Sequence, residues 1–192
     1  MINPSKNRSG IILAGGKSSR MGTDKGFILL NNKPFIQHII DCLQPLVDEI
    51  IIISNNAAYD VFGKKRVADK IINSGPLAGV YTGLFYSKTQ NNIVLSCDVP
   101  FVNQQLLSVL LQEEKKKYDI VQLQSEGKNM PLIALYQKKC APHFLKLLNS
   151  GEKRMNTAIN QLNTKTITIN ATLEKFAKNI NTPEDLKHGI EH

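Results

Sequence analysis

No apolar stretch in this 192-residue chain reaches the roughly 18 residues that would indicate a membrane-spanning helix. The first nine residues are polar and lack the apolar core of a secretion signal. We therefore expect a cytoplasmic protein with no membrane partner. Repeats, low-complexity tracts and linkers are also missing, so residues 1–192 are expected to form one domain, with 1–8 as a flexible N-terminus.

Cysteine is scarce, and Cys42, Cys97 and Cys140 show no C-x-x-C spacing. This pattern argues against a zinc site, and the odd count fits no disulfide framework. Free thiols of this kind are usually buried in or near the core. The four histidines show no metal-ligand spacing, and the sequence indicates no Ser-His-Asp set.

Acidic residues are outnumbered, since 24 Lys and Arg face 16 Asp and Glu, for a formal net charge of +8. Such a charge could attract nucleic acid, a membrane surface or a phosphorylated small molecule. The densest basic run directly follows Glu113 and Glu114, as expected for the solvated end of a helix. Aromatic residues make up only 6%, which leaves little for base stacking, so we expect no nucleic-acid partner.

Short apolar runs alternate with amphipathic segments along the chain. The run Ile50–Ile53 is β-branched without alternation, which is typical of a parallel strand covered by helices on both faces. The pattern predicts a layered α/β domain with a mostly parallel sheet. Strands are expected at 10–14, 49–54, 64–68, 92–97, 118–123, 131–136 and 165–169, and helices at 34–45, 77–88, 103–116, 140–149, 154–161 and 183–190.

The most informative segment is LAGGKSSRMGTDK at 13–25, which follows the first predicted strand. It places three glycines and the basic side chains Lys17, Arg20 and Lys25 in one loop. Glycine lets backbone N–H groups approach and face an anion, and α/β folds often hold phosphate in such a loop. We expect a nucleotide-phosphate site, although glycine loops also serve as plain turns.

Two better-known phosphate loops do not match this segment. A P-loop needs a glycine five residues before its Gly-Lys-Ser, and Ile11 stands there instead. The dinucleotide-binding G-x-G-x-x-G pattern fails because Lys17 follows Gly15 and Gly16. The loop is therefore another glycine-rich design.

Two aspartates follow predicted strands. Asp98 comes directly after the strand at 92–97, and Asp69 follows the strand at 64–68. In open α/β sheets the carboxyl ends of the strands carry the ligands. The two carboxylates could together hold one Mg²⁺ with phosphate oxygens and waters, or they could be unrelated surface acids.

A second glycine loop, Gly75-Pro76-Leu77-Ala78-Gly79, precedes a predicted helix. Its glycines, Gly75 and Gly79, would let a ligand approach the backbone. Simple entry into the helix is the alternative.

Taken in order, these elements resemble the molybdenum cofactor guanylyltransferases, the MobA family of nucleotidyltransferases. The likeness runs from about residue 10 to residue 190. It implies a three-layer α/β/α Rossmann-like nucleotidyltransferase fold, mostly parallel, with helices on both faces. The matching stretches are LAGGKSSRMGTDKG at 13–26, KPFIQH at 33–38, GPLAG at 75–79, CDVPF at 97–101, PLIALY at 131–136, GEKRM at 151–155 and NTPEDL at 181–186.

The resemblance implies Mg²⁺-dependent transfer of GMP from GTP to the terminal phosphate of molybdopterin that carries molybdenum, with release of pyrophosphate. It also implies possible contacts with other cofactor-biosynthesis proteins and with apo-molybdoenzymes. Three alternatives remain: a relative that uses CTP, one that acts on a sugar phosphate, and a catalytically inactive GTP-binding module. Ala14-Gly15-Gly16 favours guanine, since relatives that use CTP tend to carry Ala-Ala-Gly there.

The resemblance and the chemistry together give a set of candidate site residues. Arg20, Lys25 and Asp98 are the catalytic candidates, and Asp98 is the Mg²⁺ ligand. Ser54, with Asn56 second, is expected to face the base. The nucleotide-binding candidates are Leu13, Ala14, Gly15, Gly16, Lys25, Ser54, Asn56, Asp69, Gly75, Gly79 and Asp98.

The acceptor site is expected near the loops after 75–79, at 127–131 and at 151–155. In the last of these, Lys153 or Arg154 could bind the pterin phosphate, and solvated charges at a helix start are the alternative.

Overall fold

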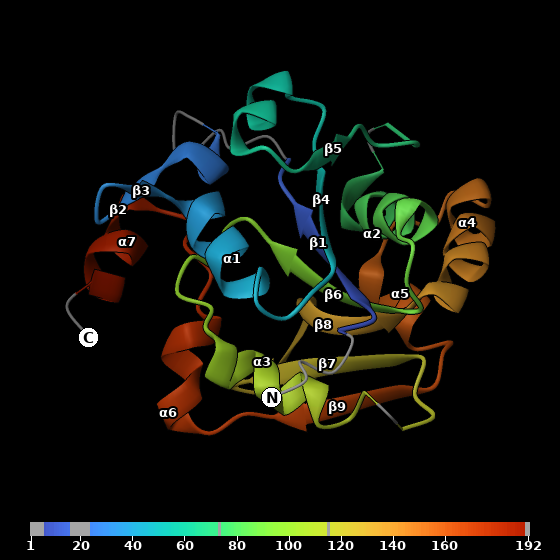
Figure 1. Ribbon diagram of the computed structural model, residues 1–192. Helices are drawn as coiled ribbons and strands as arrows, with labels where there is room; N and C mark the ends of the chain where they lie inside the picture. Colours follow the sequence, from blue (N-terminus) through green and yellow to red (C-terminus); the bar gives the residue numbers. More distant parts are fainter. Residues whose placement is uncertain (1–5, 16–23, 73, 115, 191–192) are drawn as a thin grey trace.

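The computed structural model describes residues 6–15, 24–72, 74–114 and 116–190. Its main feature is a seven-stranded sheet with strand order β5-β4-β1-β6-β8-β7-β9 (Figure 1). Every strand expected from the sequence is present. The strands are β1 (Arg8–Leu13), β4 (Glu49–Ile53), β5 (Lys65–Val67), β6 (Asn91–Ser96), β7 (Ile120–Ser125), β8 (Lys128–Gln137) and β9 (Thr164–Thr168).

The sheet is mostly parallel, as predicted. Strand β1 lies between β4 and β6 and is parallel to both, and β5 continues the parallel half beyond β4. Strand β8 is the exception, because it runs antiparallel to both β6 and β7. The tight turn at Glu126 and Gly127 explains this, since both residues have positive φ, as a two-residue hairpin turn requires.

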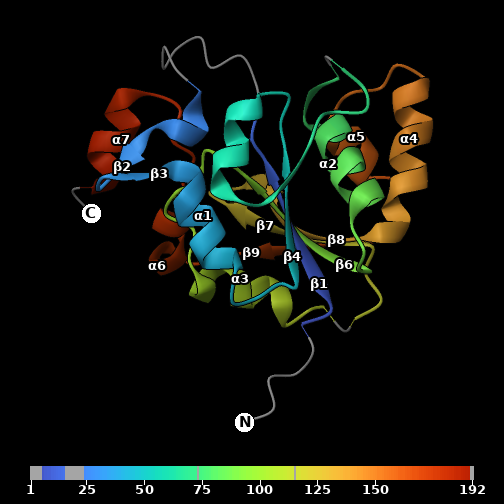
Figure 2. The ribbon, with the colours of Figure 1, turned by 45° about the horizontal axis from the view of Figure 1, so that its top comes forward.

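Two helical layers cover the two faces of the sheet (Figures 1 and 2). Helices α1 (Phe35–Leu43) and α3 (Gln104–Leu111) pack on one face. Helices α2 (Gly75–Tyr86), α4 (Ala141–Asn149) and α5 (Met155–Ile159) pack on the other. The predicted three-layer α/β/α arrangement is therefore confirmed.

The isoleucine run of β4 shows why alternation is missing from the sequence. Ile50 and Ile52 contribute to the core under α1, whereas Ile51 and Ile53 contribute to the core under α2. Both faces of this strand are buried, so each position favours an apolar side chain.

Several helix ends have the expected local causes. Asn103 caps α3, because its Oδ1 accepts a hydrogen bond from Leu106 N at 2.8 Å. Thr182 caps α7 (Pro183–Ile190) through a 3.1 Å hydrogen bond from Asp185 N to its Oγ1. The helix expected over 103–116 is shorter than predicted and ends at Leu111.

Some short elements were not predicted from the sequence. They have no apolar period long enough to identify them. They are the paired strands β2 (Leu29–Leu30) and β3 (Lys33–Pro34), the helix α6 (Ala171–Glu174), and the 3₁₀ turns η1 (Lys25–Phe27), η2 (Ala57–Phe62), η3 (Lys138–Cys140) and η4 (Lys175–Ala177).

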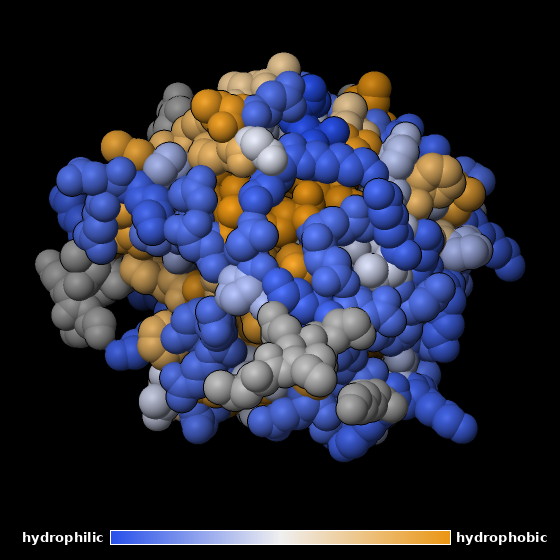
Figure 3. All heavy atoms as spheres, viewed as in Figure 1, coloured by the Kyte–Doolittle hydropathy of each residue, from blue (hydrophilic) through white to orange (hydrophobic). Residues whose placement is uncertain are grey.

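The exposed surface is largely polar, and apolar side chains gather near the middle of the face shown in Figure 3. In the described part of the chain, no helix combines the length and the apolarity needed to cross a bilayer. Residues 1–5 of the predicted flexible N-terminus lie outside the described residues, and Arg8 at its end pairs with Glu114 at 2.6 Å.

Candidate nucleotide site

The candidate site lies at the carboxyl ends of four neighbouring parallel strands, β5, β4, β1 and β6. Backbone hydrogen bonds continue beyond the strand ends here. Cys97 N donates to Leu13 O at 3.0 Å, Ala14 N to Ile53 O at 2.9 Å, and Ser54 N to Val67 O at 3.0 Å. These bonds fix the starting points of the loops that carry the predicted residues.

Lys25 and Asp98 meet at this edge. Lys25 Nζ lies 3.2 Å from Asp98 Oδ2, and both side chains are mostly shielded from solvent, with 17% and 15% exposed. The same ammonium donates to Asn181 Oδ1 at 2.6 Å. The backbone supports this arrangement, because Ile180 N donates to Asp98 O at 2.8 Å. The predicted neighbourhood of Lys25 and Asp98 is thus present, and Asn181 joins it.

Asp98 also has an oxygen available for a cation. Its Oδ1 is buried and has no hydrogen-bond partner among the residues described. A buried carboxylate oxygen without a partner is costly, and a hard cation would satisfy it. The described residues contain no cluster of three or more His, Cys, Asp or Glu side chains fit to hold a metal ion. Asp98 therefore fits a Mg²⁺ ion whose other ligands are phosphate oxygens and water.

Asp69 lies at the same edge of the sheet, on the side of α2. A Cβ on Gly79 would lie 3.7 Å from Asp69 Oδ1 and 3.1 Å from Leu13 Cδ2, so the absent side chain leaves room for both. Burial raises the pKa of the Asp69 carboxyl. Its Oδ1, like that of Asp98, has no hydrogen-bond partner within the described ranges.

The two aspartates follow strands that are not neighbours in the sheet. Strands β4 and β1 stand between β5 and β6, and three strand spacings amount to about 14 Å. The arrangement with both carboxylates on one Mg²⁺, left open from the sequence, stays a prediction. Asp69 and Asp98 border the space above β4 and β1.

The three polar side chains in the turn after β4, at 54–56, make different hydrogen bonds. Ser54 is buried, and its hydroxyl accepts a hydrogen bond from Asn56 N at 3.1 Å. Asn56 caps η2 by accepting from Ala58 N at 3.0 Å. Asn55, which the sequence prediction passed over, accepts from Asp69 N at 3.0 Å and so links this turn to Asp69.

Asp24 was also missed, although its position directly before Lys25 was a usable signal. Its Oδ1 accepts from Gly26 N at 3.3 Å and from the hydroxyl of Tyr59, and its Oδ2 accepts from Asn56 Nδ2 at 3.1 Å. This carboxylate holds the start of η1 against the turn after β4.

The first glycine loop, at 13–25, is only partly described. Ala14 is buried, and Gly15 is exposed with open space where a Cβ would stand. Gly16 and Arg20 lie outside the described residues, so their predicted roles stay predictions.

The loop after α4 approaches the start of α2. Gly75 has a φ of +67°, and a Cβ there would lie 3.9 Å from Lys153 O. Arg154, the other candidate in this loop, pairs with Glu152 at 2.6 Å. Hydrogen bonds from Arg154 lower the pKa of the Glu152 carboxyl to about 2. The loops at 75–79 and 151–155 therefore lie near each other, and their place at the acceptor site stays a prediction.

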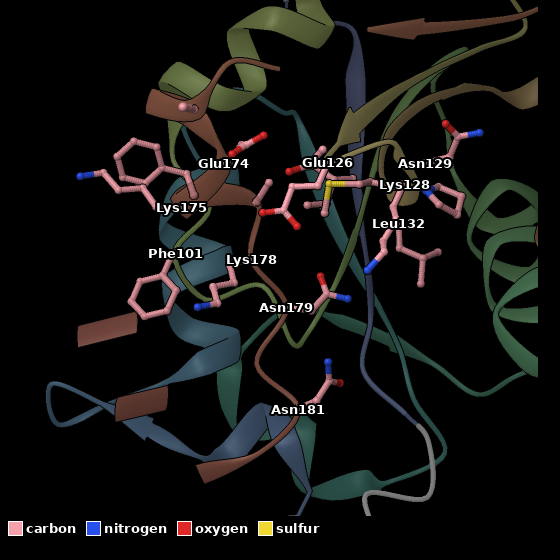
Figure 4. A pocket seen from close by; sticks show the side chains of 17 residues that line it. Phe101, Glu126, Lys128, Asn129, Leu132, Glu174, Lys175, Lys178, Asn179 and Asn181 are labelled. Atoms are coloured by element: carbon pink, nitrogen blue, oxygen red, sulfur yellow. The ribbon is translucent and has the colours of Figure 1, made fainter. Parts of the chain in front are cut away.

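A pocket of about 920 Å³ adjoins the Lys25 and Asp98 pair. In Figure 4 the side chains of the β7–β8 hairpin and those of 174–178 lie on opposite sides of it, with Asn179 and Asn181 nearby. Asn181 lines the pocket and contacts Lys25, so one residue connects the two. Lys128 and Lys178 contribute basic side chains to the lining.

Comparison with known proteins shows what this chain is similar to. Residues 10–166 match the family model described as the MobA-like NTP transferase domain. A probable molybdenum cofactor guanylyltransferase of Flavobacterium johnsoniae is 35% identical over 91% of this chain and 92% of its own length. A molybdenum cofactor guanylyltransferase of Vibrio parahaemolyticus is 34% identical over 97% and 96% of the two chains.

The fold has a close match among solved structures. The molybdopterin-guanine dinucleotide biosynthesis protein A of Archaeoglobus fulgidus superimposes with a TM-score of 0.81 at 24% identity, covering 95% of this chain and 97% of that protein. At this identity the comparison supports the fold.

Proposed function

The chain belongs to the MobA-like NTP transferase family, and on that premise we propose that it is a molybdenum cofactor guanylyltransferase. It transfers GMP from GTP to the terminal phosphate of molybdopterin that carries molybdenum, and pyrophosphate leaves. The observation that carries this proposal is the Lys25 and Asp98 pair, which lies at the carboxyl edge of the parallel strands and adjoins a pocket through Asn181.

The reaction joins two anions, and this sets the demands on the site. A pterin phosphate oxygen attacks the α-phosphorus of GTP, and the bond from that phosphorus to the β-phosphate oxygen breaks. A phosphate monoester is already largely ionised at neutral pH, because its second pKa is near ~6, so no protein base is needed. The site must instead offset repulsion between phosphates, which the Lys25 ammonium can do.

Magnesium dependence is part of the proposal. Asp98 would hold the ion through Oδ1, the buried oxygen that has no partner among the residues described. When bound, Mg²⁺ would supply positive charge to the phosphate oxygens of GTP. Lys25 is within reach of the same carboxylate, so the two cations would act on one set of phosphates.

The acceptor is proposed to occupy the pocket beside Asn181. The predicted acceptor loop at 127–131 contributes Lys128, Asn129, Met130 and Pro131 to its lining. Lys178 adds positive charge at the same pocket, which suits a phosphorylated pterin. The nucleoside would lie on the other side of Lys25, near Asn55 and Asp69.

We further propose that the protein acts in the cytoplasm, where other cofactor-biosynthesis proteins would supply the pterin. Apo-molybdoenzymes would receive the dinucleotide product. These partners follow from the proposed reaction.

The reaction can be tested with purified protein, GTP, Mg²⁺ and molybdenum-loaded molybdopterin. The expected result is pyrophosphate release together with the guanine dinucleotide. A preference for CTP would move the protein to a cytidylyl-transferring relative, and activity on a sugar 1-phosphate without activity on the pterin would reject the proposed acceptor. Binding of GTP without any pyrophosphate would indicate a catalytically inactive module.

A further inference from the structure

The Asp24 carboxylate connects two parts of the chain that are far apart in sequence. Its Oδ1 accepts from Gly26 N at 3.3 Å and from the Tyr59 hydroxyl, which is 35 residues away. Its Oδ2 accepts from Asn56 Nδ2 at 3.1 Å. One side chain therefore joins the segment that carries Lys25 to the segment that follows β4.

The Tyr59 hydroxyl is held firmly at this carboxylate. The Tyr59 ring is fully buried, and its centroid lies 4.7 Å from that of Phe27 and 6.1 Å from that of Phe62. Gly26 leaves the space that the hydroxyl needs, because a Cβ there would lie 2.2 Å from the Tyr59 oxygen. Burial first, with the nearby Asp24 adding to it, raises the pKa of Tyr59, so its hydroxyl stays protonated and donates.

The neighbours of the two joined segments belong to the two halves of the nucleotide site. Lys25 follows Asp24 directly and reaches Asp98 and Asn181. On the other segment, Asn55 precedes Asn56 and accepts from Asp69 N. Asp24 thus lies between the phosphate side and the nucleoside side of the site.

We propose that Tyr59 is a positioning residue: through Asp24 it holds Lys25 in register with the turn at 54–56, so that both halves of the nucleotide site form one rigid unit. The inference rests on the proposed function, since Lys25 must meet the phosphates of GTP. Tyr59 itself is fully buried, so the role that we propose for it is indirect.

The first test uses ligand-free protein and needs no nucleotide. Tyr59→Phe keeps the buried ring and removes only the hydroxyl. Tyr81→Phe is the matched control, since Tyr81 is also buried but lies on α2 in the opposite core. Hydrogen exchange in peptides covering 24–28 should be faster in Tyr59→Phe than in wild type and unchanged in Tyr81→Phe. Equal exchange in all three proteins would overturn the proposal.

The second test asks whether Tyr59 acts through Lys25. Calorimetric titration with GTP and Mg²⁺ should give an affinity about tenfold weaker in Tyr59→Phe, since the lost bond was made to a charged group. In a Lys25→Met background the same change should have little further effect. A tenfold loss that persists without Lys25 would show a merely structural role and overturn the proposal.

The outcomes separate the two proposals. Failure of the wild type to bind GTP would reject the proposed function, whereas unchanged exchange at 24–28 would reject the role of Tyr59 whatever nucleotide binds. Asp24→Asn serves as a second variant, because an amide NH₂ cannot accept the hydrogen bond from Asn56 that Oδ2 accepts. It should speed exchange at 24–28 in the same way.

Discussion

At the scale of single residues, the proposed site depends on the surroundings of its two aspartates. Asp98 pairs with a lysine and keeps one buried oxygen without a partner among the described residues. Asp69 is half-buried beside Gly79, and burial raises the pKa of its carboxyl. Their different surroundings predict different consequences for activity and stability.

Replacing Asp98 by asparagine should reduce turnover by about 100-fold or more, because the change removes the carboxylate charge that would hold Mg²⁺ at the phosphates. The fold should persist, since the variant keeps the backbone hydrogen bond from Ile180 and the approximate shape of the side chain. Pyrophosphate release measures the first effect, and thermal unfolding measures the second. Turnover within a factor of two of wild type would contradict the role of Asp98.

Asp69 should limit stability at neutral pH. Burial raises the pKa of its carboxyl above the ordinary value of 3.8, so the folded state binds the proton more tightly than the unfolded state. Asp69 therefore favours folding below the unfolded pKa, and this contribution is lost as pH rises through the raised folded pKa.

The Asp69→Asn variant should accordingly unfold at a higher temperature than wild type at pH 7, and the difference should shrink toward pH 3. Thermal unfolding across that pH range measures it. An equal shift at every pH would show that the carboxyl does not titrate differently in the folded state. Activity should fall in the variant, since Asp69 is a proposed nucleotide-binding residue.

Asp98 could be chosen from sequence because it directly follows a buried strand, and position after such a strand fixes the sheet edge on which a residue lies. Asn55 and Asp24 could not be chosen in this way. Their importance comes from hydrogen bonds to Asp69, Asn56 and Tyr59, and those contacts depend on tertiary packing.

At the scale of elements, the local backbone geometry at two positions leads to predictions about stability. The first position is a close approach of a helix to a strand. Helix α2 lies against β1 at Gly83, where an added Cβ would meet Ile11 Cγ2 at 2.4 Å. The sequence shows this glycine inside a helical pattern, where glycine normally weakens the helix.

Gly83→Ala should destabilise the protein by about 1–3 kcal/mol, because overpacking against β1 outweighs the gain in helix propensity. Urea unfolding measures the change. In an Ile11→Ala background, which removes that Cγ2, the same change should cost less. A more stable Gly83→Ala variant would show that α2 does not approach β1 so closely.

The β7–β8 hairpin carries Glu126 at a φ of +49° next to Gly127 at +74°. Asparagine tolerates this conformation better than glutamate, and Asn-Gly is the preferred pair for such a turn. Glu126→Asn should therefore raise the free energy of unfolding by about 0.5–1 kcal/mol, as measured by urea unfolding. Glu126→Ala, which removes the charge but keeps the strain, is the control, and an equal gain there would attribute the effect to charge.

Long elements were predictable because apolar period and turn residues agree with their final packing, as in β4 and α4. The hairpin that reverses β8 was not predicted, since a parallel strand and an antiparallel strand have the same apolar run when both faces are buried. Helix α6 and η2 were missed because elements of four to six residues are fixed by their caps and contacts.

At the scale of the whole molecule, the proposed reaction needs two substrates on either side of the Lys25 ammonium. The nucleotide would lie over β4 and β1, and the acceptor would lie in the pocket between the β7–β8 hairpin and 174–178. Lys25 and Asn181 stand between the two. The sequence indicated which segments form the acceptor loops, but it could not predict the pocket. A pocket exists only once the layers are packed against one another.

Reversing one charge in the pocket should affect the binding of the two substrates differently. Lys178→Glu should raise the KM for the pterin by about tenfold through repulsion of its phosphate, while the affinity for GTP stays near that of wild type. Lys165→Glu, an exposed change of the same kind on β9 and away from the pocket, is the control. Initial rates at varied pterin measure the effect, and a matching loss of GTP affinity would place the nucleotide in this pocket instead.

The most direct measurement is a crystal structure of the protein with Mg²⁺ and a GTP analogue that resists transfer. We predict phosphate oxygens at Lys25, the metal ion on Asp98 Oδ1, and guanine beside residues 54–56 and Asp69. A nucleotide bound between the β7–β8 hairpin and 174–178, with Asp98 touching neither metal nor phosphate, would contradict this prediction.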